Sequence, residues 1–178
     1  IMERLIFEKN IAAVGEIGID LYWDKTYRKE QEEAFRRQIR WAKEAALPVV
    51  IHARDSFDEI FRVMDGEADD ALTGVFHSFT GNHEQAERAL SYGFCIGING
   101  IVTFRNSGLD RVVAEIDPGK LLIETDAPFL APVPFRGKRN ESMYVIEVAK
   151  KIAEIHGLEP EEVASMTTEN ALNLFKIS

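Results

Sequence analysis

The sequence predicts an α/β fold built on parallel strands, arranged either as a layered sheet or as a barrel. Short apolar runs of strand length alternate five times with segments of helical periodicity, and connections of helix length are typical of parallel pairing. Four of these runs close with a residue that can ligate a metal, at the position where a β/α barrel carries its active site. The 178 residues, 46% of them hydrophobic, can bury one core, so we expect a single domain over residues 1–178.

The first predicted strand covers residues 11–17 and carries Glu16 near its end. Gly15 and Gly18 flank this glutamate and allow a neighbouring backbone to approach closely. A carboxylate in such an apolar setting needs a partner, and either a metal or another cation would supply it. Glu16 is therefore a candidate metal ligand.

A loop over residues 20–26 follows and contains Tyr22 and Trp23. The two rings either anchor the loop or stack a nucleobase, and we favour anchoring. A helix is predicted over residues 27–46, because apolar residues recur on one face with charged residues opposite.

The second predicted strand, residues 48–54, reads P-V-V-I-H-A-R and contains His52 near its end. A buried parallel strand is a continuous apolar run, and in a β/α barrel the residue at its C-terminal end points into the active site. Ser56 and Glu59 then have the spacing of a capping box, which predicts the start of a helix.

The third predicted strand, residues 72–79, contains His77. Asn82, with Gln85 three residues later, predicts a capped helix to about residue 92. The remaining predicted elements are a strand at 94–99, a helix at 109–116, a strand at 121–125 and helices at 142–156, 160–166 and 169–175.

The four histidines fall into two classes. His83 lies in the first turn of a predicted helix and His156 in the last turn of another, so both are interpreted as structural or solvated residues. His52 and His77 close buried strands and are interpreted as metal ligands. Asp126 follows the fifth strand and is interpreted as a further ligand.

Glu124 lies two residues before Asp126, so both side chains can face the same side of the strand. We interpret Glu124 either as a residue that supports a ligand or as a bystander. Cys95 is the only cysteine, which excludes an intramolecular disulfide and a multi-cysteine zinc site.

The net charge of −9 argues against a broad basic surface that coats nucleic acid, but it leaves room for an enzyme that acts at chain ends. One dense cationic segment, R-G-K-R, contains Arg136, Lys138 and Arg139. It either holds a phosphate or forms a solvated loop.

Membrane insertion is not expected. No run approaches the roughly 18 apolar residues of a membrane span, and no signal segment opens the sequence. The sequence therefore predicts a soluble cytoplasmic protein that does not associate with a membrane.

Five segments carry a recognisable pattern: G-E-I-G-I-D-L-Y-W-D from residue 15, P-V-V-I-H-A-R-D from 48, G-V-F-H-S-F-T-G from 74, L-I-E-T-D-A-P from 122 and R-G-K-R-N-E from 136. In this order the set resembles the TatD-like metal-dependent deoxyribonucleases of the amidohydrolase superfamily. The similarity runs from about residue 11 to residue 175.

The resemblance implies a TIM-type (β/α)8 barrel that holds two divalent ions and hydrolyses phosphodiester bonds, trimming single-stranded DNA from the 3′ end. It implies that Glu16 bridges the ions and that His52 and His77 hold one of them. Asp126 would bind the other ion and accept the proton of the attacking water. The basic residues Arg136, Lys138 and Arg139 would contact phosphate. The ligand types suit zinc, manganese or, less readily, magnesium.

One departure from the family pattern concerns the first strand. Family members open with a His-x-His pair that completes the first metal site, and these 178 residues contain no such pair. The resemblance therefore implies a partial barrel that lacks about the first three βα units, in which the first site keeps only Glu16 and Asp126. Two alternatives stay open: a hydrolase of another ester, such as an aminoacyl-tRNA, and a non-catalytic fragment that needs a partner.

Overall fold

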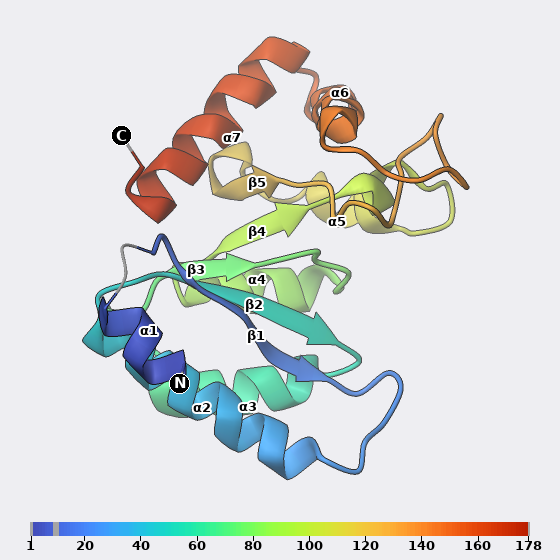
Figure 1. Cartoon of the computed structure of the whole chain (residues 1–178). Coiled ribbons are helices and arrows are strands. Elements are labelled where there is room, and N and C mark those ends of the chain that lie inside the picture. The colour runs from blue at the N-terminus through green and yellow to red at the C-terminus, as the bar shows by residue number, and fades with distance from the viewer. Residues whose placement is uncertain (1, 9–10, 178) are drawn as a thin grey trace.

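The computed structural model describes residues 2–8 and 11–177 and contains one parallel five-stranded sheet. The strands pair in sequence order and have the bounds β1 Val14–Asp20, β2 Val49–Arg54, β3 Gly74–Phe76, β4 Cys95–Ile98 and β5 Leu121–Ile123. In Figure 1 the arrows of β1 to β4 point toward the same side of the molecule, and the connecting loops gather there. The predicted α/β fold with parallel strands is confirmed.

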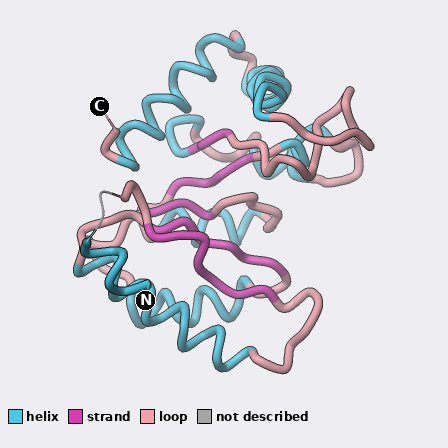
Figure 2. Tube along the Cα trace, viewed as in Figure 1, coloured by secondary structure: helices cyan, strands magenta, loops and turns pink. Residues whose placement is uncertain are grey.

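Helices connect successive strands and pack beside them. The α-helices are α1 Met2–Glu8, α2 Arg28–Glu44, α3 Phe57–Glu67, α4 His83–Ser91, α5 Leu109–Val113, α6 Val145–His156 and α7 Pro160–Phe175. Short 3-10 turns are η1 Gly100–Thr103, η2 Pro118–Lys120 and η3 Ser142–Tyr144. Figures 1 and 2 show α2 and α3 near β1 and β2, and α6 and α7 near β5. Sequential parallel strands with such helical connections are the arrangement of a (β/α)8 barrel segment.

The hydrophobic core lies between the sheet and its helices. Ile51 of β2, Phe76 of β3 and Ile96 of β4 are almost completely buried and belong to one cluster with Phe35 of α2 and Ile60 of α3. Since side chains alternate along a strand, the residue after Ile51 and the residue after Phe76 point away from this core. Those residues are histidines, so packing of the core sets the direction of both imidazoles.

An irregularity in β1 directs Glu16. Val14 and Ile17 both face the core, although strict alternation would place them on opposite faces. The pairing with β2 shifts between Gly15 and Ile17, so Glu16 is the extra residue of a bulge. At Gly18, with φ +135°, an added Cβ would lie 2.1 Å from the carbonyl oxygen of His52. Glycine is therefore required where β1 and β2 approach each other beside the site.

Several element boundaries differ from the sequence prediction. The first strand covers Val14–Asp20 rather than residues 11–17, because Ile19 supplies core contacts beyond the predicted end. Residues 160–166 and 169–175 form one helix, Pro160–Phe175, not two. The capping box at Asn82 is confirmed, with Gln85 as its second member.

The capping box predicted at Ser56 is wrong. Ser56 does precede α3, but its side chain makes no cap hydrogen bond. Its hydroxyl donates instead to the carbonyl oxygen of Ile19 at 2.5 Å and accepts from the backbone N–H of Arg54. Ser56 therefore ties the end of β2 to the end of β1.

In the described part of the chain, no helix is long and apolar enough to cross a membrane.

Candidate metal centre

Glu16 of β1, His52 of β2 and His77, which follows β3, converge at one place beside the sheet. One possible ligand atom of each lies within 4.8 Å of the others. Glu16 Oε2 is 3.8 Å from His52 Nδ1 and 3.4 Å from His77 Nε2, and the two imidazole centroids are 5.8 Å apart. Among the described residues, no other three His, Cys, Asp or Glu side chains form such a group.

Glu124 orients the imidazole ring of His77 by contacting the ring nitrogen that faces away from Glu16. The Glu124 carboxylate lies 3.4 Å from Nδ1 of His77, which leaves Nε2 directed at Glu16. Glu124 also accepts a hydrogen bond from the backbone N–H of Ser78. A carboxylate on the far nitrogen fixes the orientation of an imidazole and makes it a better ligand. Glu124 is thus in contact with a candidate ligand rather than a bystander.

The electrostatics of His77 are those of a cation site. Burial acts to lower the pKa of His77, but the hydrogen bond with Glu124 and the negative charges of Glu124, Glu16 and Asp126 outweigh it and raise the pKa above 6.5. The carboxylates therefore favour positive charge at this place.

Asp20 supports His52 in the same way and was missed by sequence reasoning. Its Oδ2 atom lies 3.4 Å from Nε2 of His52, which leaves Nδ1 facing Glu16. The Gln31 side chain accepts from the backbone N–H of Asp20 at 2.8 Å and donates to its carbonyl at 3.1 Å. The strand was predicted to end at residue 17, so Asp20 was assigned to a loop. The observed strand V-G-E-I-G-I-D ends in this acidic residue.

Asp126 follows β5 at the same side of the sheet and has a left-handed backbone, with φ 57°. Burial raises the pKa of its carboxyl, while the neighbouring His77 acts to lower it. The buried Asn140 holds the surrounding loop, because its Nδ2 donates to the carbonyl oxygens of Thr125 at 2.7 Å and Phe129 at 2.6 Å. Sequence reasoning quoted Asn140 within a motif but gave it no role.

The basic segment is exposed on the loop that follows Asp126. Arg136, Lys138 and Arg139 all lie at the surface, and the Arg136 guanidinium stacks 4.0 Å from the centroid of the Phe104 ring. No hydrogen bond or ion pair described for these residues joins the segment to the carboxylate and imidazole cluster. The structure therefore brings Glu16, His52 and His77 together and gives Asp126 an electrostatic interaction with His77, but it shows no contact between these residues and the basic segment.

The donor set fits a divalent cation. Two imidazoles and one carboxylate are ligands that zinc and manganese accept, and a catalytic site of three protein ligands keeps a position open for water or substrate. The Glu16 side chain is 58% exposed and that of His52 is 32% exposed, so this position is open to solvent. The residues present can hold one ion in this way.

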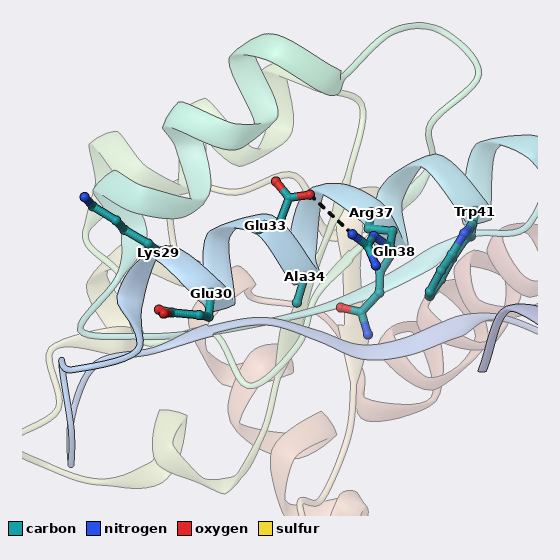
Figure 3. Close-up of a pocket in the computed structure, with 7 residues that line it drawn as sticks. All are labelled: Lys29, Glu30, Glu33, Ala34, Arg37, Gln38 and Trp41. Atoms are coloured by element: carbon teal, nitrogen blue, oxygen red, sulfur yellow. Dashed lines mark ion pairs between the residues drawn. The ribbon is translucent and has the colours of Figure 1, made fainter. Parts of the chain in front are cut away.

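A hollow of about 490 Å³ lies elsewhere, along the outer face of α2 (Figure 3). It is lined by Lys29, Glu30, Glu33, Ala34, Arg37, Gln38 and Trp41. The Glu33–Arg37 ion pair there measures 3.6 Å and is exposed. The hollow contains no cluster of ligands and no histidine, so size alone does not make it the functional site.

Proteins similar to this chain are described as metal-dependent, in agreement with a metal site at Glu16, His52 and His77. Residues 1–176 match the family model described as TatD related DNase. A protein of Bacillus subtilis (strain 168), described as the uncharacterized metal-dependent hydrolase YabD, is 45% identical over 99% of this chain and 70% of its own length. The 3′-5′ ssDNA/RNA exonuclease TatD of Salmonella typhimurium is 34% identical over 96% of this chain and 68% of its own length.

Solved structures show the same fold. The crystal structure of YJJV, a TatD homolog from Escherichia coli K12, superposes with a TM-score of 0.92 at 29% identity and covers 99% of this chain and 69% of that one. The fold, the cluster at the strand ends and the match over residues 1–176 lead to one conclusion. This chain belongs to the TatD-related DNase family and is related throughout its length to metal-dependent hydrolases.

Proposed function

We propose that the protein is a metal-dependent nuclease that hydrolyses phosphodiester bonds of single-stranded DNA and removes nucleotides from the 3′ end. The convergence of Glu16, His52 and His77 within 4.8 Å is the observation that carries this proposal. The name of the Salmonella typhimurium relative, a 3′-5′ ssDNA/RNA exonuclease, supports the choice of substrate.

In this proposal His52, His77 and Glu16 would hold one divalent ion, and Glu16 and Asp126 would be ligands of a second. Zinc, manganese or magnesium is the cofactor. Divalent ions at such a site supply a more acidic water and neutralise the charge that builds on the phosphoryl oxygens. Asp20 and Glu124 keep both imidazoles directed at the ion by contacting their far nitrogens.

Asp126 acts as the general base. Burial raises the pKa of its carboxyl, and its charge interacts with those of His77 and Glu16. A base whose pKa moves toward the working pH accepts a proton more readily in the transition state. Arg136, Lys138 and Arg139 then bind substrate phosphates, because guanidinium and ammonium groups pair with phosphate oxygens.

The test compares the metal content of three histidine variants after purification and dialysis. His52→Ala and His77→Ala are each expected to lose most bound metal and most 3′ trimming of end-labelled single-stranded DNA, because each removes one of three ligands. The control is His83→Ala, whose Nδ1 pairs with Glu115 at 2.8 Å outside the cluster, and it is expected to match the wild type. Unchanged metal content in His52→Ala and His77→Ala would refute the ligand assignment.

A further inference from the structure

The loop between β1 and α2 presents an aromatic side chain to solvent at the edge of the metal centre. Trp23 is 81% exposed and Tyr22 is 50% exposed. An aromatic residue that anchors a loop buries its ring, so the exposure of Trp23 contradicts the anchoring role favoured by sequence analysis. The exposed ring of Trp23 beside the metal centre is available to stack on a ligand.

The loop has a fixed shape. Asp20 Oδ1 accepts from the backbone N–H of Tyr22 at 2.9 Å, and the backbone N–H of Leu21 donates to the carbonyl of Arg54 at 2.9 Å. Asp24 Oδ1 accepts from the backbone N–H of Thr26 at 2.8 Å. These bonds hold the loop at both ends, so little ordering is needed when a ligand binds.

Arg54 and Tyr22 both contact the ring of Trp23. The guanidinium carbon of Arg54 lies 3.8 Å from the Tyr22 centroid and 5.8 Å from that of Trp23. The two rings meet at a right angle, with centroids 4.7 Å apart. Cation–π and edge-to-face contacts of this kind fix ring orientation. We call Tyr22, Trp23 and Arg54 the aromatic shelf.

The aromatic shelf is joined directly to the metal centre. Arg54 lies two residues after His52 on β2, and one carboxylate oxygen, Asp20 Oδ2, is 3.4 Å from His52 Nε2 and 4.0 Å from Arg54 Nη1. A single DNA strand with one phosphodiester bound at Glu16, His52 and His77 would therefore bring a neighbouring base to the aromatic shelf.

Net charge also favours stacking as the means of holding the strand. With a net charge of −9, the chain has little long-range attraction for a polyanion. Base–aromatic stacking is insensitive to that charge and tolerates any sequence, because every base has a π-face. The aromatic shelf supplies this kind of contact.

We propose that Trp23 stacks on a nucleobase adjacent to the scissile phosphodiester, with Tyr22 and Arg54 as positioning residues. This inference rests on the proposed nuclease function and adds to it a subsite for the base. It makes the base, rather than the phosphates alone, a determinant of binding.

The first test measures steady-state kinetics of the purified, metal-loaded protein on two substrates. One is a short single-stranded oligothymidylate, and the other is an abasic oligonucleotide with the same phosphates, a phosphodiester substrate without bases or any other aromatic ring. Trp23→Ala is expected to raise KM for the oligothymidylate by about fivefold or more and to leave hydrolysis of the abasic oligonucleotide unchanged. Trp23→Phe, which keeps a ring, is expected to restore most of the binding.

The matched control is Trp41→Phe, because Trp41 lines the hollow on α2 away from the shelf. It is expected to behave as wild type with both substrates. An unchanged oligothymidylate KM in Trp23→Ala would overturn the inference while the proposed function stands. A wild-type protein that cleaves neither substrate in the presence of zinc, manganese or magnesium would overturn both.

A second test observes binding without turnover. The chain has two tryptophans, so fluorescence of Trp41→Phe reports Trp23 alone. In metal-free buffer with chelator, oligothymidylate is expected to quench this emission, and an abasic oligonucleotide with the same phosphates is expected not to. Equal quenching by both oligonucleotides would show that the base is not recognised and would overturn the inference.

Discussion

Each imidazole of the metal centre has one nitrogen toward Glu16 and the other toward a carboxylate. Asp20 faces Nε2 of His52, and Glu124 faces Nδ1 of His77. The two histidines therefore present different ring nitrogens to the same glutamate oxygen. The carboxylates fix the orientation of both rings and leave one nitrogen of each histidine available to bind a metal ion. A site whose ligands are held in place in this way is preorganised.

Asp20 can be tested by removing its charge. Asp20→Asn is expected to lower the affinity of the metal-free protein for zinc or manganese by about 10–100-fold, because a neutral amide orients His52 less strongly. Titration calorimetry measures the change. Asp24→Asn, in the same loop but bonded to Thr26, is the control, and equal affinities of the two variants would remove Asp20 from the metal site.

Asp126 can be distinguished from the two histidine ligands by its effect on turnover. Asp126→Asn is expected to abolish hydrolysis, since the amide cannot accept the proton of the attacking water. It is expected to retain oligonucleotide binding and the ion held by the two histidines. The measurements are single-turnover cleavage and filter binding on the same preparation. A variant that still turns over at the wild-type rate would exclude Asp126 as the base.

At the residue scale, the sequence predicted residues that end or follow apolar runs, left the supporting role of Glu124 open and missed Asp20, which acts through His52. Glu16, His52, His77 and Asp126 stand out because each interrupts or follows a hydrophobic run. Asp20 takes its role from its distance to His52, 32 positions away in sequence. Local patterns carry no information about such distances.

At the scale of elements, charged contacts fasten α2 to α3 and so hold β1 and β2 in their places. Glu67 of α3 accepts from Arg36 Nη1 at 3.0 Å and from Arg40 Nη2 at 2.7 Å, and Lys43 donates to its carbonyl oxygen at 2.9 Å. The Glu67 side chain is only 8% exposed. The hydrogen bond from Arg40 lowers the pKa of Glu67 below its ordinary value of 4.5, against the opposite effect of burial.

Glu67→Gln is expected to lower the free energy of unfolding at pH 7 by about 1 kcal/mol, a value reduced by the exposure of the arginines. Since the folded-state pKa is lowered, this contribution is complete above pH 4.5 and is lost as the pH falls through the lowered pKa. Urea unfolding at several pH values measures it. Glu33→Gln, in the exposed pair with Arg37, should change nothing at any pH.

Strand and helix order could be predicted from the sequence, whereas element ends could not. The alternation of apolar runs with helical periodicity is a strong signal, and all five predicted strands occur. The ends of β1 and the role of Ser56 depend on tertiary contacts, because the bulge at Glu16 and the bond to Ile19 join segments far apart in sequence. The cost of leaving such groups unpaired overrides local propensity.

At the scale of the whole molecule, parallel pairing in sequence order explains why distant residues meet. The parallel strands run in the same direction, so His52 of β2, His77 after β3 and Asp126 after β5 lie at one edge of the sheet, and the bulge in β1 brings Glu16 to His52 and His77. The core lies on the helix side and leaves this edge free for chemistry. The chain spans 70% of the length of its Bacillus subtilis relative, and the three clustered ligands all lie within it.

Anomalous X-ray diffraction from crystals soaked in zinc or manganese tests the central claim most directly. We predict an anomalous peak about 2.0–2.2 Å from Nδ1 of His52, Nε2 of His77 and a carboxylate oxygen of Glu16. A peak located only at other surface carboxylates, or none at these three side chains at saturating metal, would contradict the account.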